Sequence, residues 1–263
     1  MDGAGGNPPS TLSADLFGQH GSLLSFKVAG EITEGRTLMS VDLAQTARLM
    51  VSDFLTTVRA PVLSRRFQQA VATASGPVWV NVGAGTVVLR GWINTDVRWR
   101  SDMYLDLTKP WPVPPGSVDR IYADNVIEHF SLEAARDVLR HCYSALRPGG
   151  AVRFATPDLE RTARAYLEDP ALTAAHLERH RRHGYPAEHP ADLLRVTYAY
   201  HGHHEGYIFD WNALSSELTT AGFVDVRRYE TGQSDDPAFQ RLETRAETTE
   251  KATELIVEAR KSA

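Results

Sequence analysis

The chain has little cysteine, no long apolar run and no excess of positive charge. Each of these excludes a class of protein. Its single cysteine, Cys142, excludes an internal disulfide bond and a metal site built from several thiolates. No apolar run approaches the roughly 20 residues that a membrane-spanning helix needs. Positive charge is not in excess, since the net charge is -5, so the basic surface of a nucleic-acid-binding protein is not expected. The start also lacks the basic and apolar segments of a secretion signal, and we expect a cytoplasmic protein.

The composition is that of an ordinary globular protein with a full core. The chain has 263 residues, of which 42% are hydrophobic and 23% charged. Residues 1–10 hold little to bury and predict a disordered start. Apolar residues at helical spacing predict helices over 42–58 and 61–74. We therefore expect an N-terminal extension over residues 1–75 and one main domain over residues 76–263.

Within the main domain, short apolar segments alternate with helical ones. The predicted strands are 78–82, 92–96, 120–123, 151–155, 223–229 and 254–259. For the last of these, a terminal amphipathic helix is the alternative. One helix is expected to follow Ser131 as N-cap, with Cys142 on its buried stripe, and another to span 210–221. This alternation predicts an α/β fold with a mainly parallel sheet and helices on both faces.

The first two predicted strands flank a glycine turn. Gly83 and Gly85 leave the backbone without Cβ atoms where a ligand must approach closely, and Asp96 ends the second strand. A carboxylate at that place can accept hydrogen bonds from the two hydroxyls of a ribose. The pattern predicts a nucleotide-cofactor cradle, and the alternative is a tight turn without a ligand.

Several segments, in order, carry a family resemblance. They are Asn81-Val82-Gly83-Ala84-Gly85, Asp96, the stretch 102–107, the stretch 118–130 and Leu146-Arg147-Pro148-Gly149-Gly150. Over roughly 78–261 the chain resembles the class I S-adenosylmethionine-dependent methyltransferases, most closely bacterial small-molecule O-methyltransferases. One departure concerns Asn81, because the family's first motif usually opens with an acid. An amide can accept a hydrogen bond but offers no charge to the cationic end of the cofactor.

The resemblance implies a Rossmann-like, mainly parallel seven-stranded sheet in which the last strand runs antiparallel. It also implies S-adenosylmethionine as cofactor and an insertion near 158–208 that contacts the methyl acceptor. The cofactor-binding residues so implied are Asn81, Gly83, Ala84, Gly85, Asp96, Val97, Asp106, Leu107, Asp124 and Asn125. For Asp106 a solvated loop acid is the alternative. N-terminal extensions in the family often cover the cofactor or pair subunits, so a homodimer is expected, and a helix that merely packs on the sheet edge is the alternative.

Because a sulfonium methyl group is already electrophilic, the protein must align an acceptor and remove its proton. Asn125, Glu128 and His129 are spaced to lie on one side of a helical turn. Related O-methyltransferases of the ubiquinone-biosynthesis type have an acid at the first position and bind a divalent ion, so the resemblance implies Mg²⁺ on these three residues. The alternatives are His129 as an unaided base with Glu128 beside it, or a structural role for both.

Histidines are dense between residues 176 and 207. His201 and His204 are predicted to assist or replace His129, and His203 and Tyr207 to face the pocket with them. Such side chains suit a small polar acceptor rich in hydroxyls, such as a saccharide. The sequence thus predicts methyl transfer to a hydroxyl oxygen. The alternatives are a carboxylate, phenol or amine acceptor, or a non-catalytic adenosine-binding module.

Overall fold

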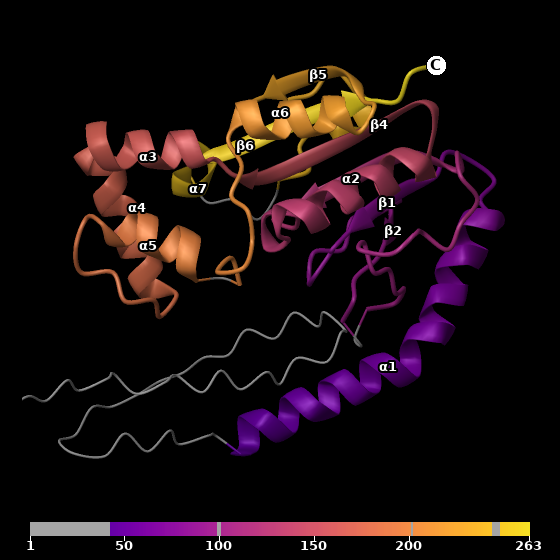
Figure 1. The fold of residues 1–263 in the computed structure, drawn as a ribbon, viewed down its shortest axis with the longest axis horizontal. Coiled ribbons are helices and arrows are strands. Elements are labelled where there is room, and N and C mark those ends of the chain that lie inside the picture. The colour runs from indigo at the N-terminus through magenta and orange to yellow at the C-terminus, as the bar shows by residue number, and fades with distance from the viewer. Residues whose placement is uncertain (1–42, 99–100, 201, 244–247) are drawn as a thin grey trace, which may run out of the picture.

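A computed structural model describes residues 43–98, 101–200, 202–243 and 248–263. In these residues a six-stranded sheet has the order β2-β1-β3-β4-β6-β5 (Figure 1). Its strands are β1 (Trp79–Val82), β2 (Ile93–Asn94), β3 (Val118–Asp124), β4 (Leu146–Pro157), β5 (Val224–Tyr229) and β6 (Glu254–Arg260). The first four run parallel, and β6 lies antiparallel between β4 and β5. The predicted Rossmann-like class is confirmed, including the inserted last strand.

The expected strand count of seven is wrong for the residues that the structure describes. Residues 103–105 pass the end of β2 but make only one parallel bridge, between Asp96 and Tyr104. The chain turns at Asp106, whose carboxylate accepts from the N–H and the hydroxyl of Thr108. Four prolines follow between residues 110 and 115, and proline has no N–H to donate to a sheet ladder. The chain therefore crosses this edge as a loop rather than as a seventh strand.

Helices and short turns connect the strands. They are α1 (Leu43–Ala72), η1 (Ile127–His129), α2 (Leu132–Ala145), α3 (Leu159–Glu168), α4 (Pro170–Arg182), α5 (Asp192–Ala199), α6 (Trp211–Thr220), η2 (Pro237–Phe239) and α7 (Thr248–Ala252). The predicted cap of α2 is present, since Ser131 Oγ accepts from the backbone N–H of Ala134. Asp210 caps α6 in the same way. No helix among the described residues combines the length and apolarity that crossing a membrane requires.

The two predicted N-terminal helices are one continuous helix, α1, with Pro61 inside it. Proline removes a single backbone hydrogen bond, which tertiary packing can offset. That packing comes from the buried side chains of Leu63 and Phe67, the latter edge-on to Trp111. Residues 1–10, predicted to be disordered, lie outside the described residues.

The two faces of the sheet differ in chemistry. One face is apolar and packs against α2 and α6, whose buried stripes include the predicted core residue Cys142. On the other face, Arg153 of β4 is fully buried and pairs with Glu243 and with Glu258 of β6. The segment between β5 and β6 supplies Glu243, and Phe239 of the same segment packs against Trp92. The sequence analysis predicted helices on both faces of the sheet. It did not predict this buried ionic layer.

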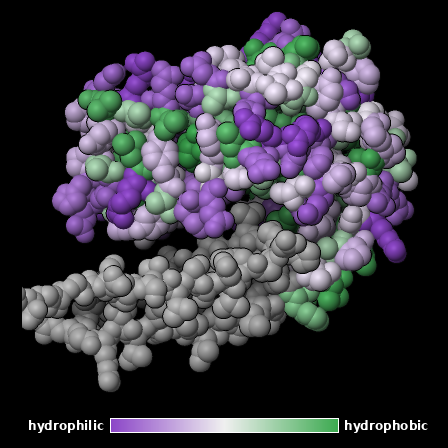
Figure 2. Space-filling view, viewed as in Figure 1, coloured by the Kyte–Doolittle hydropathy of each residue, from purple (hydrophilic) through white to green (hydrophobic). Residues whose placement is uncertain are grey.

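Part of α1 presents apolar side chains to solvent. Phe54, Val58 and Val62 follow one another at helical spacing and are 66%, 56% and 56% exposed. Figure 2 shows hydrophobic surface where the described part of α1 lies. The predicted homodimer stays a prediction, and this face is where light scattering on a Phe54→Ser variant would test it.

Candidate functional site

The glycine loop after β1 packs directly on the turn η1. Gly83 and Gly85 both adopt left-handed backbone angles, with φ of 60° and 57°. A Cβ atom on Gly83 would stand 2.5 Å from Cγ2 of Val126, the residue before η1. Glycine is thus required at position 83 for conformation and for close packing. The predicted cofactor loop and the predicted catalytic segment consequently form one unit.

Asp96 follows β2 and lies against the glycine loop, at the place where the sequence analysis predicts an acid that binds ribose. Its carboxylate is buried, and Oδ2 accepts from the N–H of Gly85 at 2.8 Å. Oδ1 accepts from the N–H of Arg98 at 2.9 Å. A carboxylate has about four lone-pair sites, so both oxygens can still accept from ribose hydroxyls. Asp96 therefore links the glycine loop to the end of β2, with Val97 half-buried beside it.

Asn81 has a local role. Its amide nitrogen donates to Oδ1 of Asn94 at 2.9 Å and to the carbonyl of Val87 at 3.2 Å. Asn94 in turn bonds both the N–H and the carbonyl of Leu89. These bonds hold the loop over residues 83–92 in place. They use the N–H groups of the Asn81 amide, which a carboxylate would lack, and this explains why an amide is buried where the family that the chain resembles has an acid. A contact between Asn81 and the cofactor stays a prediction.

The remaining predicted cofactor residues lie at different depths. Asp106 accepts from the N–H and hydroxyl of Thr108 and so stabilises its own turn, while Leu107 is buried in the core. Asp124 is buried at the end of β3, and the exposed Asn125 follows it with a left-handed φ of 52°. The end of β3 therefore turns sharply into η1.

Three side chains meet beside this turn. Glu128 and His129 belong to η1, and His203 comes from the loop after α5. Their potential donor atoms all lie within 4.8 Å of one another, and Nε2 of His203 is 3.9 Å from Oε1 of Glu128. Glu128 is fully buried and His203 is 7% exposed. The tertiary fold thus joins the two adjacent predicted residues to a third from the insertion.

The surroundings of His129 favour the neutral form of its imidazole. Burial lowers its pKa below the ordinary 6.5, with a smaller contribution of the same sign from Arg98. Hydrogen bonds with the backbone of Gly202 and Asn125 act in the opposite direction. A neutral imidazole can accept a proton or bind a metal ion.

A cavity of about 310 Å³ opens beside this cluster. Asn125, His129 and Pro157 form its floor at the carboxyl ends of β3 and β4, which is where open α/β sheets bind ligands. Helices of the insertion supply the opposite wall. The other lining residues are Arg98, Thr162, His176, Arg179, His180, Thr197, His203, Glu250, Thr253 and Glu254.

Not all of the predicted histidines lie in this cavity. His203 lines it, together with His176 and His180 from α4. His204 is exposed and is not a lining residue, and His201 lies outside the described residues. Catalytic roles for His201 and His204 stay predictions. His176, beside the hydroxyl of Thr253, has its pKa lowered to about 4, chiefly by burial.

Glu254 is a cavity residue that the sequence analysis missed. It is the first residue of β6, and because β6 is antiparallel its start lies at the carboxyl ends of the other strands. Burial, then the charges of Asp124 and Glu243, raise its pKa from 4.5 to about 7. In the sequence Glu254 is one acid among many, and only its strand direction could have suggested this position.

This shift predicts how stability depends on pH. The folded protein holds the Glu254 proton more tightly than the unfolded chain, so this acid costs stability as the pH rises from about 4.5 through 7. This pKa shift corresponds to about 3 kcal/mol of unfolding free energy. We expect Glu254→Gln to be more stable than the wild type at pH 8 by up to that amount, and by little at pH 5, in urea unfolding. Exposed Glu188→Gln is the control, and an equal effect of Glu254→Gln at both pH values would contradict the prediction.

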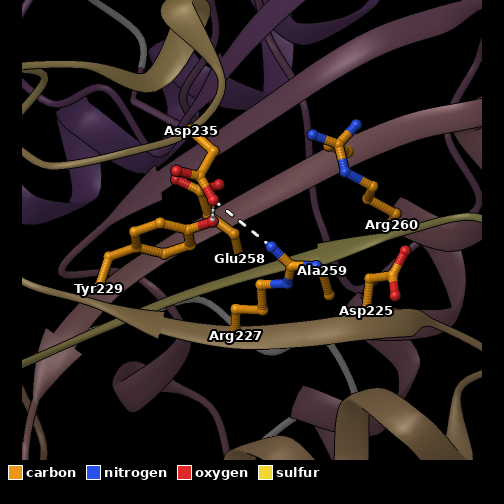
Figure 3. Close-up of a pocket in the computed structure, with 8 residues that line it drawn as sticks. Asp225, Arg227, Tyr229, Asp235, Glu258, Ala259 and Arg260 are labelled. Carbon is orange, nitrogen blue, oxygen red and sulfur yellow. Dashed lines mark hydrogen bonds and ion pairs between the residues drawn. The ribbon is translucent and has the colours of Figure 1, made fainter.

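A second, smaller hollow is not a comparable site. It measures about 60 Å³ and lies between β5, β6 and the start of β4 (Figure 3). Asp235 bridges Tyr229 and Arg227 there. The hollow lies toward the amino end of β4, away from the glycine loop. The larger cavity is therefore the candidate site.

Comparison with known proteins finds a methyltransferase domain in part of this chain. Residues 96–154 match a family model described as a methyltransferase domain. This segment runs from Asp96 through Glu128 and His129 into β4. A comparison with curated protein sequences found no match. The match agrees with the predicted methyltransferase for this segment, whereas residues 158–208 lie outside it.

Solved structures similar to this chain include methyltransferases. An O-methyltransferase family protein from Burkholderia thailandensis is 14% identical, with a TM-score of 0.43, over 84% of this chain and 61% of that one. Human N-acetylserotonin methyltransferase, solved with S-adenosylmethionine, is 16% identical, with a TM-score of 0.41, over 78% and 52%. A putative O-methyltransferase from Nostoc punctiforme is 13% identical, with a TM-score of 0.41, over 79% and 59%. The chain thus spans about three fifths or less of the length of these proteins.

Proposed function

We propose that this protein transfers the methyl group of S-adenosylmethionine to a hydroxyl oxygen of a small polar acceptor of the saccharide type. The observation that carries the proposal is the cavity at the carboxyl ends of β3 and β4. It adjoins the loop of Gly83 and Asp96 through η1. The side chains that line it include imidazole, guanidinium, carboxylate and hydroxyl groups. Such groups suit an acceptor that presents several hydroxyls.

Each part of the site has a task in this reaction. Asp96 accepts from the ribose hydroxyls, and Gly83, Ala84 and Gly85 pass beneath the methionine part of the cofactor. The sulfonium carbon needs only an aligned nucleophile, so the cavity wall orients one acceptor hydroxyl toward it. His129, neutral and at the cavity floor, accepts the hydroxyl proton as the oxygen attacks. The products are the methyl ether and S-adenosylhomocysteine.

Replacing Asp96 with alanine tests the cofactor site. The substitution removes charge-assisted hydrogen bonds worth roughly 1.5 to 3 kcal/mol each, so affinity for S-adenosylhomocysteine should fall at least about tenfold. Isothermal titration calorimetry measures this directly. Exposed Asp102→Ala is the matched control and should bind as the wild type does. Unchanged affinity in Asp96→Ala would overturn the cofactor assignment.

A methyl-transfer screen tests the acceptor class. Glycosides, phenols, carboxylic acids and amines are offered with S-adenosylmethionine, and S-adenosylhomocysteine release is measured. We expect release with hydroxyl-rich acceptors. Release of S-adenosylhomocysteine only with an amine or a carboxylic acid would contradict the proposed hydroxyl acceptor and identify that other class as the acceptor. Tight cofactor binding without any release would favour the non-catalytic adenosine-binding module.

The predicted Mg²⁺ on Asn125, Glu128 and His129 is not supported by the donor set. Among the His, Cys, Asp and Glu side chains described, the converging set is Glu128, His129 and His203. Mg²⁺ prefers oxygen ligands, whereas this set offers two imidazoles. The Asn125 amide nitrogen instead donates to Asp124 at 3.3 Å. We therefore assign no step of the reaction to Mg²⁺.

A further inference from the structure

One guanidinium of the cavity lining has no counter-charge in the part of the chain that the structure describes. Arg98 is exposed and lines the cavity, and its side chain makes no hydrogen bond or ion pair with the described residues. The other arginine of the lining, Arg179, forms an ion pair with Glu250. We propose that Arg98 binds an anionic group, a carboxylate or a phosphate, on the methyl acceptor. This inference rests on the proposed methyl transfer and narrows its acceptor to an anionic saccharide.

The backbone of Arg98 is fixed by the residue assigned to the ribose. Its N–H donates to Oδ1 of Asp96 at 2.9 Å, and its carbonyl accepts from the N–H of Ser101 at 3.0 Å. Asp96 also accepts from the N–H of Gly85 in the glycine loop. The side chain of Arg98 therefore begins beside the proposed cofactor site and extends into the cavity lining, where no residue of the glycine loop is found.

The acids of the lining lie toward the other end of the cavity. Glu250 belongs to α7 and Glu254 begins β6, whereas Arg98 follows β2. The sheet order places β1, β3 and β4 between β2 and β6. With strands about 4.8 Å apart, the four spacings between β2 and β6 amount to roughly 19 Å. Salt screens most of the attraction between charges so far apart, so these acids do not neutralise Arg98.

His129 lines the same cavity and feels the charge of Arg98. Burial is the main cause of the lowered pKa of His129, and the charge of Arg98 adds to it. An anionic group bound to Arg98 would offset that contribution, which makes the imidazole a stronger base when an anionic acceptor is in place. A neutral acceptor would leave the positive charge to oppose proton uptake by His129.

The loop of the insertion that packs against η1 holds His129 in position. A Cβ atom on Gly206 would stand 1.8 Å from the carbonyl oxygen of Glu128 and 3.2 Å from Cα of His129. His203, on the same loop, places its ring beside that of His129, with the centroids 4.8 Å apart. An anion at Arg98 and a hydroxyl at His129 are thus held at a defined separation. The methylated hydroxyl should therefore be one that lies near the anionic group of the acceptor.

The chemistry of the guanidinium fits this role. It is planar and always charged, and its paired N–H donors match two oxygens of a carboxylate or a phosphate. A hydrogen bond to a charged group stabilises a complex enough to change its affinity about tenfold or more. Arg98 is therefore expected to select anionic acceptors over neutral ones of the same size.

Binding of saccharide probes to the full chain tests this selectivity without turnover. Uronic acids, sugar phosphates and the matching neutral methyl glycosides are titrated by calorimetry into protein saturated with S-adenosylhomocysteine. We expect an anionic probe to bind at least about tenfold more tightly than its neutral match, with a preference that weakens as salt is added. The uronic acids and the sugar phosphates distinguish a carboxylate from a phosphate.

Variants of Arg98 identify the group responsible. Arg98→Met removes the charge and should lower affinity for the anionic probe at least about tenfold, to that of the neutral glycoside. Arg98→Lys keeps the charge but loses the paired donors, so its affinity should be intermediate. Arg90→Met is the matched control, because Arg90 is exposed and is not among the lining residues, and it should bind every probe as the wild type does.

Affinity for S-adenosylhomocysteine separates the possible failures and reports folding. Arg98→Met should bind S-adenosylhomocysteine as the wild type does. A tenfold loss would place Arg98 on the carboxylate of the cofactor and overturn its assignment to the acceptor. Equal probe affinity in Arg98→Met and the wild type, or no preference for anionic probes in the wild type, would overturn it too and leave methyl transfer in place. A wild type that binds no S-adenosylhomocysteine would instead overturn the proposed function on which this inference rests.

Discussion

Replacing His129 with alanine is expected to lower kcat by about 10² to 10⁴ while affinity for S-adenosylhomocysteine stays nearly intact. A positioned imidazole contributes that order of rate by accepting a proton in the transition state. His129 lies at the cavity floor with a lowered pKa, and the proposed cofactor site lies at Gly83 and Asp96. Steady-state kinetics with the acceptor found by the screen, together with calorimetry, measures both quantities.

The contrast with His204 makes this result specific. His204 is exposed and does not line the cavity, so His204→Ala should leave kcat close to the wild-type value, and it should raise the acceptor KM only if the residue binds substrate. Turnover at the wild-type rate in His129→Ala, with kcat lost in a later histidine variant, would place the base in the insertion. His129 as an unaided base and His129 as a metal ligand both predict the kcat loss. Full activity of the wild type after exhaustive chelation would leave the unaided base.

Replacing Arg153 with methionine is expected to cost about 3 to 5 kcal/mol of unfolding free energy. Arg153 is fully buried and donates two hydrogen bonds to Glu243, at 2.7 and 3.0 Å, and others to Glu258 and the carbonyl of Gln233. Removing one partner of a buried ionic group leaves uncompensated charge in a low dielectric. Urea unfolding at neutral pH measures the loss.

Two comparisons test the physical reason. Arg164→Met removes an arginine whose partners, Glu160 and Glu168, are exposed, and it should change stability little. Adding Glu243→Leu to Arg153→Met removes one of the stranded carboxylates and should recover part of the loss. A small loss in Arg153→Met, equal to that of Arg164→Met, would show that the ionic layer is hydrated rather than buried.

Local patterns in the sequence determined most of the fold. Apolar segments separated by turn residues predicted the six observed strands to within a few residues, except that β2 is shorter and β4 longer than expected. Ser131 and the apolar stripe behind it predicted α2 with its cap. The glycine turn and Asp96 were found because a left-handed φ and a buried acid each demand particular residue types at fixed places. Such demands arise between residues close in the chain, so they can be read from the sequence.

Only the tertiary structure decided which distant side chains meet. His203 reaches Glu128 and His129 because Gly206 lets one loop pack on the backbone of another. Glu254 enters the cavity because β6 runs antiparallel, and Arg153 is buried because a segment far along the chain supplies Glu243. Pro61 likewise stays within one helix because Leu63 and Phe67, on the turns that follow it, pack into the core. The sequence by itself determined the elements and the glycine loop, whereas the cavity beside that loop depends on packing between segments that share no local pattern.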